Sequence, residues 1–226
     1  MYAELALGGG RTIWRSSGSV GAVIAADGCV DLILRNEEVF VAGPSTRWLE
    51  TRADGDGGTL GLRLPPGEAR NFLALDLSEI TDQLAMLTDL LGRNAASRAR
   101  KFLLRAQARP HAPDLAAAFG AQSSQVQSWA SFVRGQARRG ASPSLVAQSL
   151  DCSPRTFRRR MLEDFGYPYL TLVRIARAES ARAFLLDGVG AAEAAALAGY
   201  ADQPHLSREF RRLVGVSPAQ FPGSSA

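Results

Sequence analysis

The sequence predicts an α+β protein of two domains, with a small β-barrel in front and an all-α part at the C-terminal end. Short apolar runs separated by turn residues fill residues 1–78, and apolar residues at helical spacing follow. Two pairs of short helices with matching start and stop signals lie beyond residue 138. We therefore expect domains at residues 1–78 and 139–226, joined by a helical connector at 79–138.

The strands expected in the front domain are bounded by turn residues. Residues 20–24 and 30–34 are β-branched or apolar, and they flank Asp27-Gly28, a dipeptide favoured in turns. Residues 60–64 alternate leucine with glycine or arginine, which is the period-two pattern of a strand. Short strands at this spacing are typical of a small barrel or sandwich.

The connector is expected to be helical. Ser78 is a candidate N-cap, and Leu84, Leu87 and Leu91 follow on one helical face. These leucines could form a seam between two copies in a homodimer, but packing within the chain is the favoured use. A further helix is expected at residues 124–138.

Charge is divided unevenly along the chain. Residues 134–226 carry 13 arginines, no lysine and eight acidic residues, a net charge of +5, whereas residues 1–133 have a net charge of −1. A basic C-terminal part is the electrostatic footprint of a nucleic-acid-binding module, although a solvated basic face would have the same composition.

Composition also bears on location and chemistry. The chain has neither a run of 18 apolar residues nor an export signal, and Cys29 and Cys152 lie in different expected domains. A cytoplasmic protein without a disulfide is therefore expected. The single histidine of the front half, His111, is flanked by prolines, so we expect no metal, no other cofactor and no catalytic residue. Cys29 is expected to be a small buried residue rather than a reactive thiol.

The first helix pair has the signals of a helix-turn-helix unit. Ser142 and Ser153 each precede a proline, the arrangement of an N-cap followed by proline at the first helical position. Asp151-Cys152 makes the turn between the helices. Gly166 ends the second helix, where a left-handed residue is needed.

The second helix of this unit has a core face and an arginine face. Phe157 and the residues four and eight positions later should point inward, whereas Arg155, Arg158 and Arg159 fall on another face. Arginine suits a base-reading face because its fork can bridge O6 and N7 of guanine. Arg160 is expected to reach a phosphate or solvent. An amphipathic surface helix is the alternative interpretation.

The second helix pair repeats this arrangement. Gly199 permits a tight turn, Asp202 caps the following helix, and Leu206 and Phe210 should point inward. The side chains expected to point outward are Pro204, His205, Arg208 and Arg212.

A series of spaced residues in this unit carries a family resemblance. In order, they are Gly199-Tyr200, Asp202-Gln203, His205-Leu206-Ser207-Arg208, Phe210-Arg211-Arg212 and Gly215-Val216-Ser217-Pro218. They resemble the signature of AraC-type transcription regulators, and the resemblance covers residues 142–222. It implies two recognition helices held about one helical turn of DNA apart, roughly 34 Å.

The resemblance also implies which residues contact DNA. The implied positions are Arg155, Arg158 and Arg159 in the first recognition helix and Gln203, Pro204, His205 and Arg208 in the second. Four features depart from the family pattern, one of them alanine at position 194 in place of a larger aliphatic residue. Asp151-Cys152 replaces the commoner turn with glycine, and Pro204 offers only a nonpolar contact. Phe221-Pro222 lacks the usual aromatic-arginine ending, which implies one phosphate contact fewer.

The front domain shows a second resemblance. The segments DGCVDLIL, from residue 27, and VAGPSTR, from residue 41, resemble a poorly characterised cupin-like domain that occurs ahead of AraC-type modules. The resemblance covers roughly residues 5–75 and implies effector sensing or self-association. Trp14, Arg47 and Trp48 are candidates for lining an effector pocket, but a packed barrel interior explains them equally well.

These observations predict a sequence-specific, DNA-binding transcription regulator that is not an enzyme. Double-stranded DNA is the expected partner, and a small-molecule effector, RNA polymerase and a second copy of the chain are further candidates. The alternative is a cupin-like small-molecule-binding protein or enzyme whose helical tail mediates other contacts.

Overall fold

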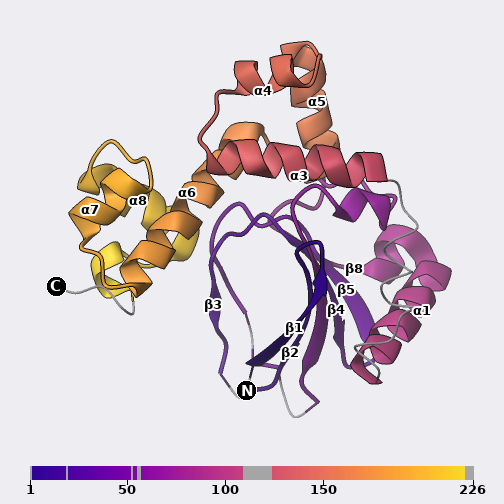
Figure 1. Cartoon of the computed structure of the whole chain (residues 1–226). Coiled ribbons are helices and arrows are strands. Elements are labelled where there is room, and N and C mark those ends of the chain that lie inside the picture. The colour runs from indigo at the N-terminus through magenta and orange to yellow at the C-terminus, as the bar shows by residue number, and fades with distance from the viewer. Residues whose placement is uncertain (1, 19, 52, 55–56, 109–123, 222–226) are drawn as a thin grey trace.

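The computed structural model describes the whole chain except residues 1, 19, 52, 55–56, 109–123 and 222–226 (Figure 1). Its strands are β1 (Tyr2–Gly8), β2 (Arg11–Ser16), β3 (Val23–Ile24), β4 (Val30–Arg35), β5 (Glu38–Ala42), β6 (Leu49–Glu50), β7 (Thr59–Leu64) and β8 (Leu84–Met86). Its helices are α1 (Leu87–Ala108), α3 (Ser124–Arg138), α4 (Pro143–Ser149), α5 (Pro154–Phe165), α6 (Tyr169–Leu186), α7 (Ala191–Leu197) and α8 (Gln203–Val214). Strands therefore precede helices, as predicted for an α+β chain of two domains.

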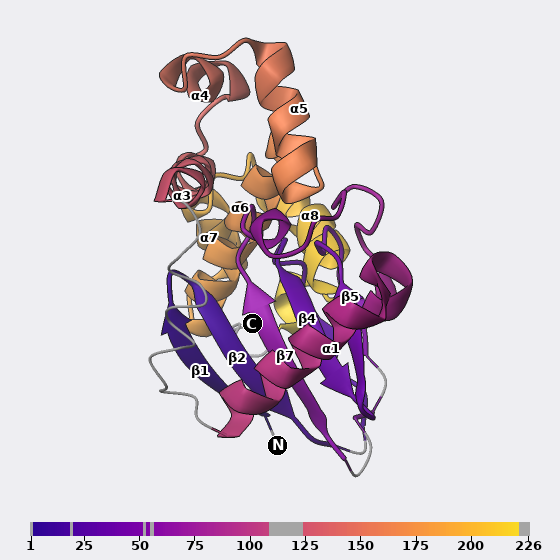
Figure 2. The ribbon, with the colours of Figure 1, turned by 90° about the vertical axis from the view of Figure 1, so that its right-hand side faces the viewer.

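The front domain is built on an antiparallel sheet of six strands in the order β1-β2-β7-β4-β5-β8, and β3 pairs separately with β6. Ile13, Leu62, Leu32 and Val41 lie side by side across four strands and are buried. They belong to a core that α1 covers from one side, and Figure 2 shows α1 lying across the sheet. The opposite face, named the polar face for Asp31 and Arg63, also carries Trp14, Ile33 and Phe40, because neighbouring residues of a strand point to opposite faces.

Two local predictions for the front half are wrong, the helix N-cap at Ser78 and the place of Leu84 on a helical face. Ser78 does not cap a helix, because residues 84–86 form strand β8, in which Leu84 pairs with Ala42 of β5. The helix begins only at Leu87. The edge of β5 offers hydrogen bonds that outweigh the local helical pattern, as tertiary context often does. Leu87 is buried, and Leu91 packs against the same front core, so both serve packing within the chain.

The strands flanking Asp27-Gly28 do not pair with each other. β3 pairs with β6, whereas β4 pairs with β5 and β7. The turn geometry at Gly28 is nevertheless real, with φ +67. Of the helices described, none has the length and apolar character that crossing a bilayer requires. The helix expected at residues 124–138 is confirmed as α3.

A buried carboxylate on the polar face of the sheet makes the stability of the fold depend on pH. Asp31 Oδ1 accepts a hydrogen bond from Trp14 Nε1 at 2.6 Å, and Arg63 Nε lies 3.3 Å away. Desolvation raises the pKa of Asp31 to about 6, with the Asp27 carboxylate adding to the shift and Arg63 opposing it. The folded state therefore holds this proton more tightly than the unfolded chain does.

Stability should consequently fall as the pH rises through about 6, because ionisation of Asp31 costs more in the folded state. Urea unfolding at about pH 5 and about pH 7 measures the effect. Asp31→Asn keeps an acceptor for Trp14 and removes the titration, so this variant should lose less stability between the two pH values. An unchanged loss in the variant would show that Asp31 is not the group responsible.

Candidate nucleic-acid interface

The start and end signals of both helix pairs are confirmed. Ser142 Oγ accepts a hydrogen bond from Leu145 N at 3.3 Å, and Ser153 Oγ accepts one from Thr156 N at 3.1 Å. Asp202 Oδ1 accepts from the backbone N–H of His205 at 2.6 Å. These caps satisfy backbone donors that helix geometry leaves without partners, so short helices can begin at defined residues.

The turns and helix ends of both units need left-handed backbone, and Gly199, in the turn between α7 and α8, supplies it with φ +77. Gly166 and Gly215 end α5 and α8 with φ +82 and +89, as the helix-stop pattern predicts. Asp151, in the turn between α4 and α5, has φ +49. Aspartate is one of the few residues other than glycine that adopt this region. Asp151 therefore takes the place of the glycine common in such turns.

The inward faces of both units are also confirmed. Phe157, Met161 and Phe165 of α5 are buried, and so are Leu206 and Phe210 of α8. They belong to one core together with α3, α6 and α7. Because the inward residues hold each second helix against this core, the opposite face of each is oriented outward.

Three arginines on α5 occupy the outward face. Arg155, Arg158 and Arg159 are all exposed. Arg159 Nε lies 3.8 Å from Glu163 Oε1 one turn later, an exposed ion pair of small energy that leaves the guanidinium free to bind elsewhere. The structure thus brings the three predicted contact residues to one exposed surface of the first unit.

Arg160, predicted to reach a phosphate or solvent, is partly exposed and also has contacts within the protein. Its guanidinium carbon lies 4.2 Å from the centre of the Trp129 ring, and its Nε lies 3.7 Å from Asp164 Oδ2. Arg160 therefore packs α5 against α3, through a cation–π contact that also covers apolar surface. The sequence contains no local signal for this contact, because Trp129 lies on a separate helix.

The outward face of α8 is less uniform. Gln203, Pro204, Arg208 and Arg212 are exposed. His205 is half-buried, because its ring packs edge-on against Tyr200, with ring centres 5.3 Å apart. Its Nδ1 accepts a hydrogen bond from the backbone N–H of Ala201 at 3.4 Å, so one of its two ring nitrogens is already used.

The front domain contacts both second helices at their C-terminal ends. A Cβ added at Gly166, after α5, would lie 2.9 Å from Leu77 O, and one at Gly215, after α8, would lie 3.0 Å from Trp48 Cδ2. The backbone N–H of Ala26 donates to Leu213 O at 2.7 Å. The front domain therefore holds both helices at their C-terminal ends, and residues near their N-terminal ends, such as Arg155 and Gln203, are exposed.

Sequence reasoning missed the residues of this contact. Arg70 Nη1 lies 3.2 Å from both Glu163 and Asp164 near the end of α5. Gly67 leaves room for Phe165, whose Cζ would lie 2.6 Å from a Cβ at that position. Glycine at positive φ was the available signal, but the side chain that needs the space lies about 100 residues later in the chain.

The three candidate effector residues do not share one pocket. Trp14 lies over Gly61 on the polar face of the sheet, where an added Cβ would lie 2.1 Å from its ring. Trp48 packs against Gly215, and Arg47 is exposed with its Nε 3.7 Å from Asp82 Oδ2. A cavity of about 680 Å³ lies elsewhere, between the front domain and helices α3 and α6.

Two family models match the chain. Residues 146–223 match a helix-turn-helix domain family, and residues 12–86 match a domain of unknown function, DUF6597. The HTH-type transcriptional regulator VirS of Mycobacterium tuberculosis is 34% identical over 80 residues. This match covers 35% of the chain but only 24% of VirS, so the chain spans about a quarter of the length of that relative.

Solved structures with similar chains include the C-terminal domain of AraT, a response regulator from Geobacillus stearothermophilus. It is 27% identical and covers 39% of this chain and 82% of its own, with a TM-score of 0.35. ToxT from Vibrio cholerae is 9% identical over 93% of this chain and 96% of its own, with a TM-score of 0.44.

Proposed function

We propose that this chain, which carries an AraC-type helix-turn-helix domain behind a domain of the DUF6597 family, is a sequence-specific DNA-binding transcription regulator. The observation that carries the proposal is the exposure of Arg155, Arg158 and Arg159 on α5 and of Arg208 and Arg212 on α8. Each set lies on the second helix of a unit, the helix that enters the major groove in helix-turn-helix proteins.

Contacts to phosphates and contacts to bases have different tasks in this proposal. Arginine contacts to phosphates supply affinity and fix the register, and contacts to base edges select the sequence. The N-terminal halves of α5 and α8 approach neighbouring major grooves of one duplex. Gln203 and Pro204 at the start of α8 add one polar and one nonpolar contact, and His205 contributes only through the ring edge not used by Ala201.

The mode of action, the cellular location and the further partners follow from the same proposal. We infer that the chain acts by binding rather than by catalysis, and in the cytoplasm, where its DNA is found. A small-molecule effector would act through the front domain, which contacts both recognition helices. RNA polymerase and a second copy of the chain are further proposed partners. In a homodimer, the front domain would supply the contact between the copies.

Selection of bound fragments from genomic DNA, followed by binding curves at several salt concentrations, tests the function. If all five exposed arginines neutralised phosphates, the slope in a plot of log K against log salt would be near −4.5, or about a 500-fold loss of affinity between about 50 and 200 mM. Each arginine that contacts a base instead of a phosphate makes this slope shallower by about 0.9. Affinity independent of salt would contradict phosphate contacts. A specificity ratio near one would indicate a non-specific architectural protein, and turnover of a substrate without DNA preference would support the alternative of a cupin-like enzyme.

A further inference from the structure

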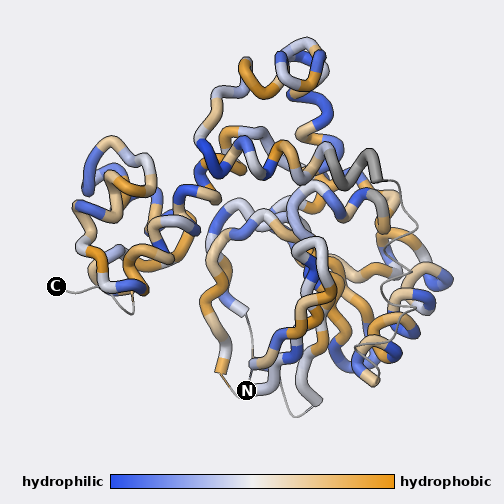
Figure 3. Tube along the Cα trace, in the orientation of Figure 1, coloured by the Kyte–Doolittle hydropathy of each residue, from blue (hydrophilic) through white to orange (hydrophobic). Residues whose placement is uncertain are grey.

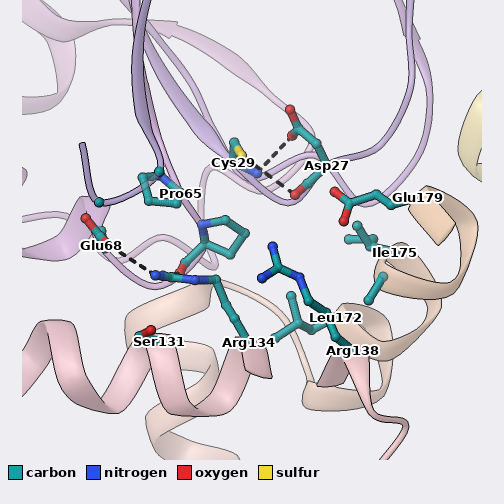
Figure 4. Close-up of a pocket in the computed structure, with 14 residues that line it drawn as sticks. Asp27, Cys29, Pro65, Glu68, Ser131, Arg134, Arg138, Leu172, Ile175 and Glu179 are labelled. Carbon is teal, nitrogen blue, oxygen red and sulfur yellow. Dashed lines mark hydrogen bonds and ion pairs between the residues drawn. The ribbon is translucent and has the colours of Figure 1, made fainter. Parts of the chain in front are cut away.

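The cavity of about 680 Å³ is shared between the two halves of the chain (Figure 4). One side is formed by the loops at Gly9-Gly10, Asp27-Cys29 and Pro65-Pro66 of the front domain. The other side is formed by α3 and by α6, the helix that joins the two helix-turn-helix units. Its volume lies in the range of small-molecule sites.

One group of charges at the cavity is already held in ion pairs within the protein, where two arginines share one carboxylate. Glu68 Oε2 lies 2.9 Å from Arg11 Nη2, and Glu68 Oε1 lies 3.2 Å from Arg134 Nη2. Arg134 Nη1 also donates to Pro66 O at 2.6 Å. These residues connect α3 to the front domain, and their side chains are engaged in contacts within the protein.

A second group of charges has no ion pair. Arg138 of α3 and Glu179 of α6 line the cavity and are exposed, and within the part of the chain that the structure describes neither has an ion-pair partner within 4 Å. In Figure 4 the guanidinium of Arg138 points into the space between the helices and the front domain, and the carboxylate of Glu179 points toward Asp27. Asp27 Oδ1 accepts hydrogen bonds from Cys29 N and Ser45 Oγ, and Oδ2 lies 3.5 Å from Arg63 Nε.

Glu179 offers an unpaired carboxylate to a positive charge, and Asp27 adds a second carboxylate that it already shares with Arg63. Desolvation raises the pKa of Glu179, and the charge of Asp27 raises it further, whereas Arg138 and Arg182 lower it. A cation between Glu179 and Asp27 would relieve their repulsion. The free guanidinium of Arg138 offers a fork for a carboxylate on the same ligand.

We propose that this cavity binds a small zwitterion of the amino-acid type. Its ammonium group would lie between Asp27 and Glu179, and its carboxylate would pair with Arg138. Leu172 and Ile175 of α6 supply an apolar wall for the side chain of the ligand. Because the site spans the front domain and the joining helix, an occupied cavity would tie α6 to the front domain.

Calorimetry on the full chain with each of the twenty common amino acids tests this site. Each amino acid is compared with the amine that lacks its carboxylate and with the acid that lacks its ammonium group. We expect at least one amino acid to bind saturably, and both of its one-charge analogues to bind at least tenfold more weakly. Absence of saturable binding across the panel, or an amine that binds as tightly as its amino acid, would overturn the proposal.

Variants assign the binding to this cavity. Arg138→Met and Glu179→Gln should each weaken binding of the selected amino acid at least tenfold. Arg139→Met is the matched control, because Arg139 is the exposed next residue and does not line the cavity. Circular dichroism establishes that each variant is folded. Unchanged affinity in folded Arg138→Met or Glu179→Gln would overturn the assignment. Neither measurement uses DNA, so failure here is distinguishable from failure of the proposed function.

Discussion

Replacing Arg158 and Arg159 together by alanine should weaken binding to the preferred DNA site by about 2–6 kcal/mol. Each good bidentate contact of an arginine to a guanine contributes about 1–3 kcal/mol of discrimination, and the two side chains are both exposed on the outward face of α5. The loss should be larger on the selected site than on random DNA, because base contacts carry the specificity. Binding curves on the two DNAs at one salt concentration measure both quantities.

A double variant with the same change in charge is the control. Arg93 and Arg98 are exposed on α1, in a different part of the molecule from α5 and α8. Their replacement by alanine should lower the affinity for selected and random DNA alike, and only slightly. If the control and the Arg158→Ala, Arg159→Ala protein lost the same affinity, α5 would contribute net charge rather than base recognition.

Replacing Phe165 by alanine should reduce the free energy of unfolding by about 3–5 kcal/mol, the usual range for a fully buried phenylalanine. Phe165 is the last residue of α5 and is completely buried. Its ring packs edge-on against Trp129 of α3, with ring centres 5.4 Å apart, and lies against Gly67 of the front domain. The cavity left behind would therefore loosen α5 from both neighbours.

Urea unfolding of this variant and of Leu170→Ala provides the measurement. Leu170 lies nearby on α6 but is 54% exposed, so its replacement should change the free energy of unfolding by no more than about 0.5 kcal/mol. A similar small change in Phe165→Ala would mean that the front domain and α3 do not hold the end of α5. Loss of a single cooperative transition would instead show that the two halves unfold separately.

The helix pairs could be predicted from sequence because their determinants are local. A cap, a proline at the first helical position and a left-handed stop all lie within one short segment, as at Ser153, Pro154 and Gly166. The inward residues repeat at helical spacing. Exposure of Arg155 and Arg158 then follows, because side chains on opposite faces of a helix have opposite environments.

Other features could not be predicted because they depend on distant partners. Leu84 fits a helical pattern, but it lies in strand β8, which pairs with the edge of β5. Arg160 has the pattern of a solvent-facing residue and is partly exposed, but its cation–π contact with Trp129 has no local signal. The turn at Gly28 has a sequence signal, but its close contact with Tyr167, whose Oη would lie 2.1 Å from an added Cβ, does not. Strand pairing and domain contact thus required the three-dimensional structure.

Contact of α5 and α8 with neighbouring major grooves can be tested directly by guanine methylation interference on the selected DNA site. Methyl groups at guanine N7 block contacts in the major groove. We predict two clusters of interfering guanines with centres about 10 base pairs apart, the first weakened by Arg158→Ala and the second by Arg208→Ala. A single cluster, or two clusters that both respond to the same variant, would contradict reading by two recognition helices.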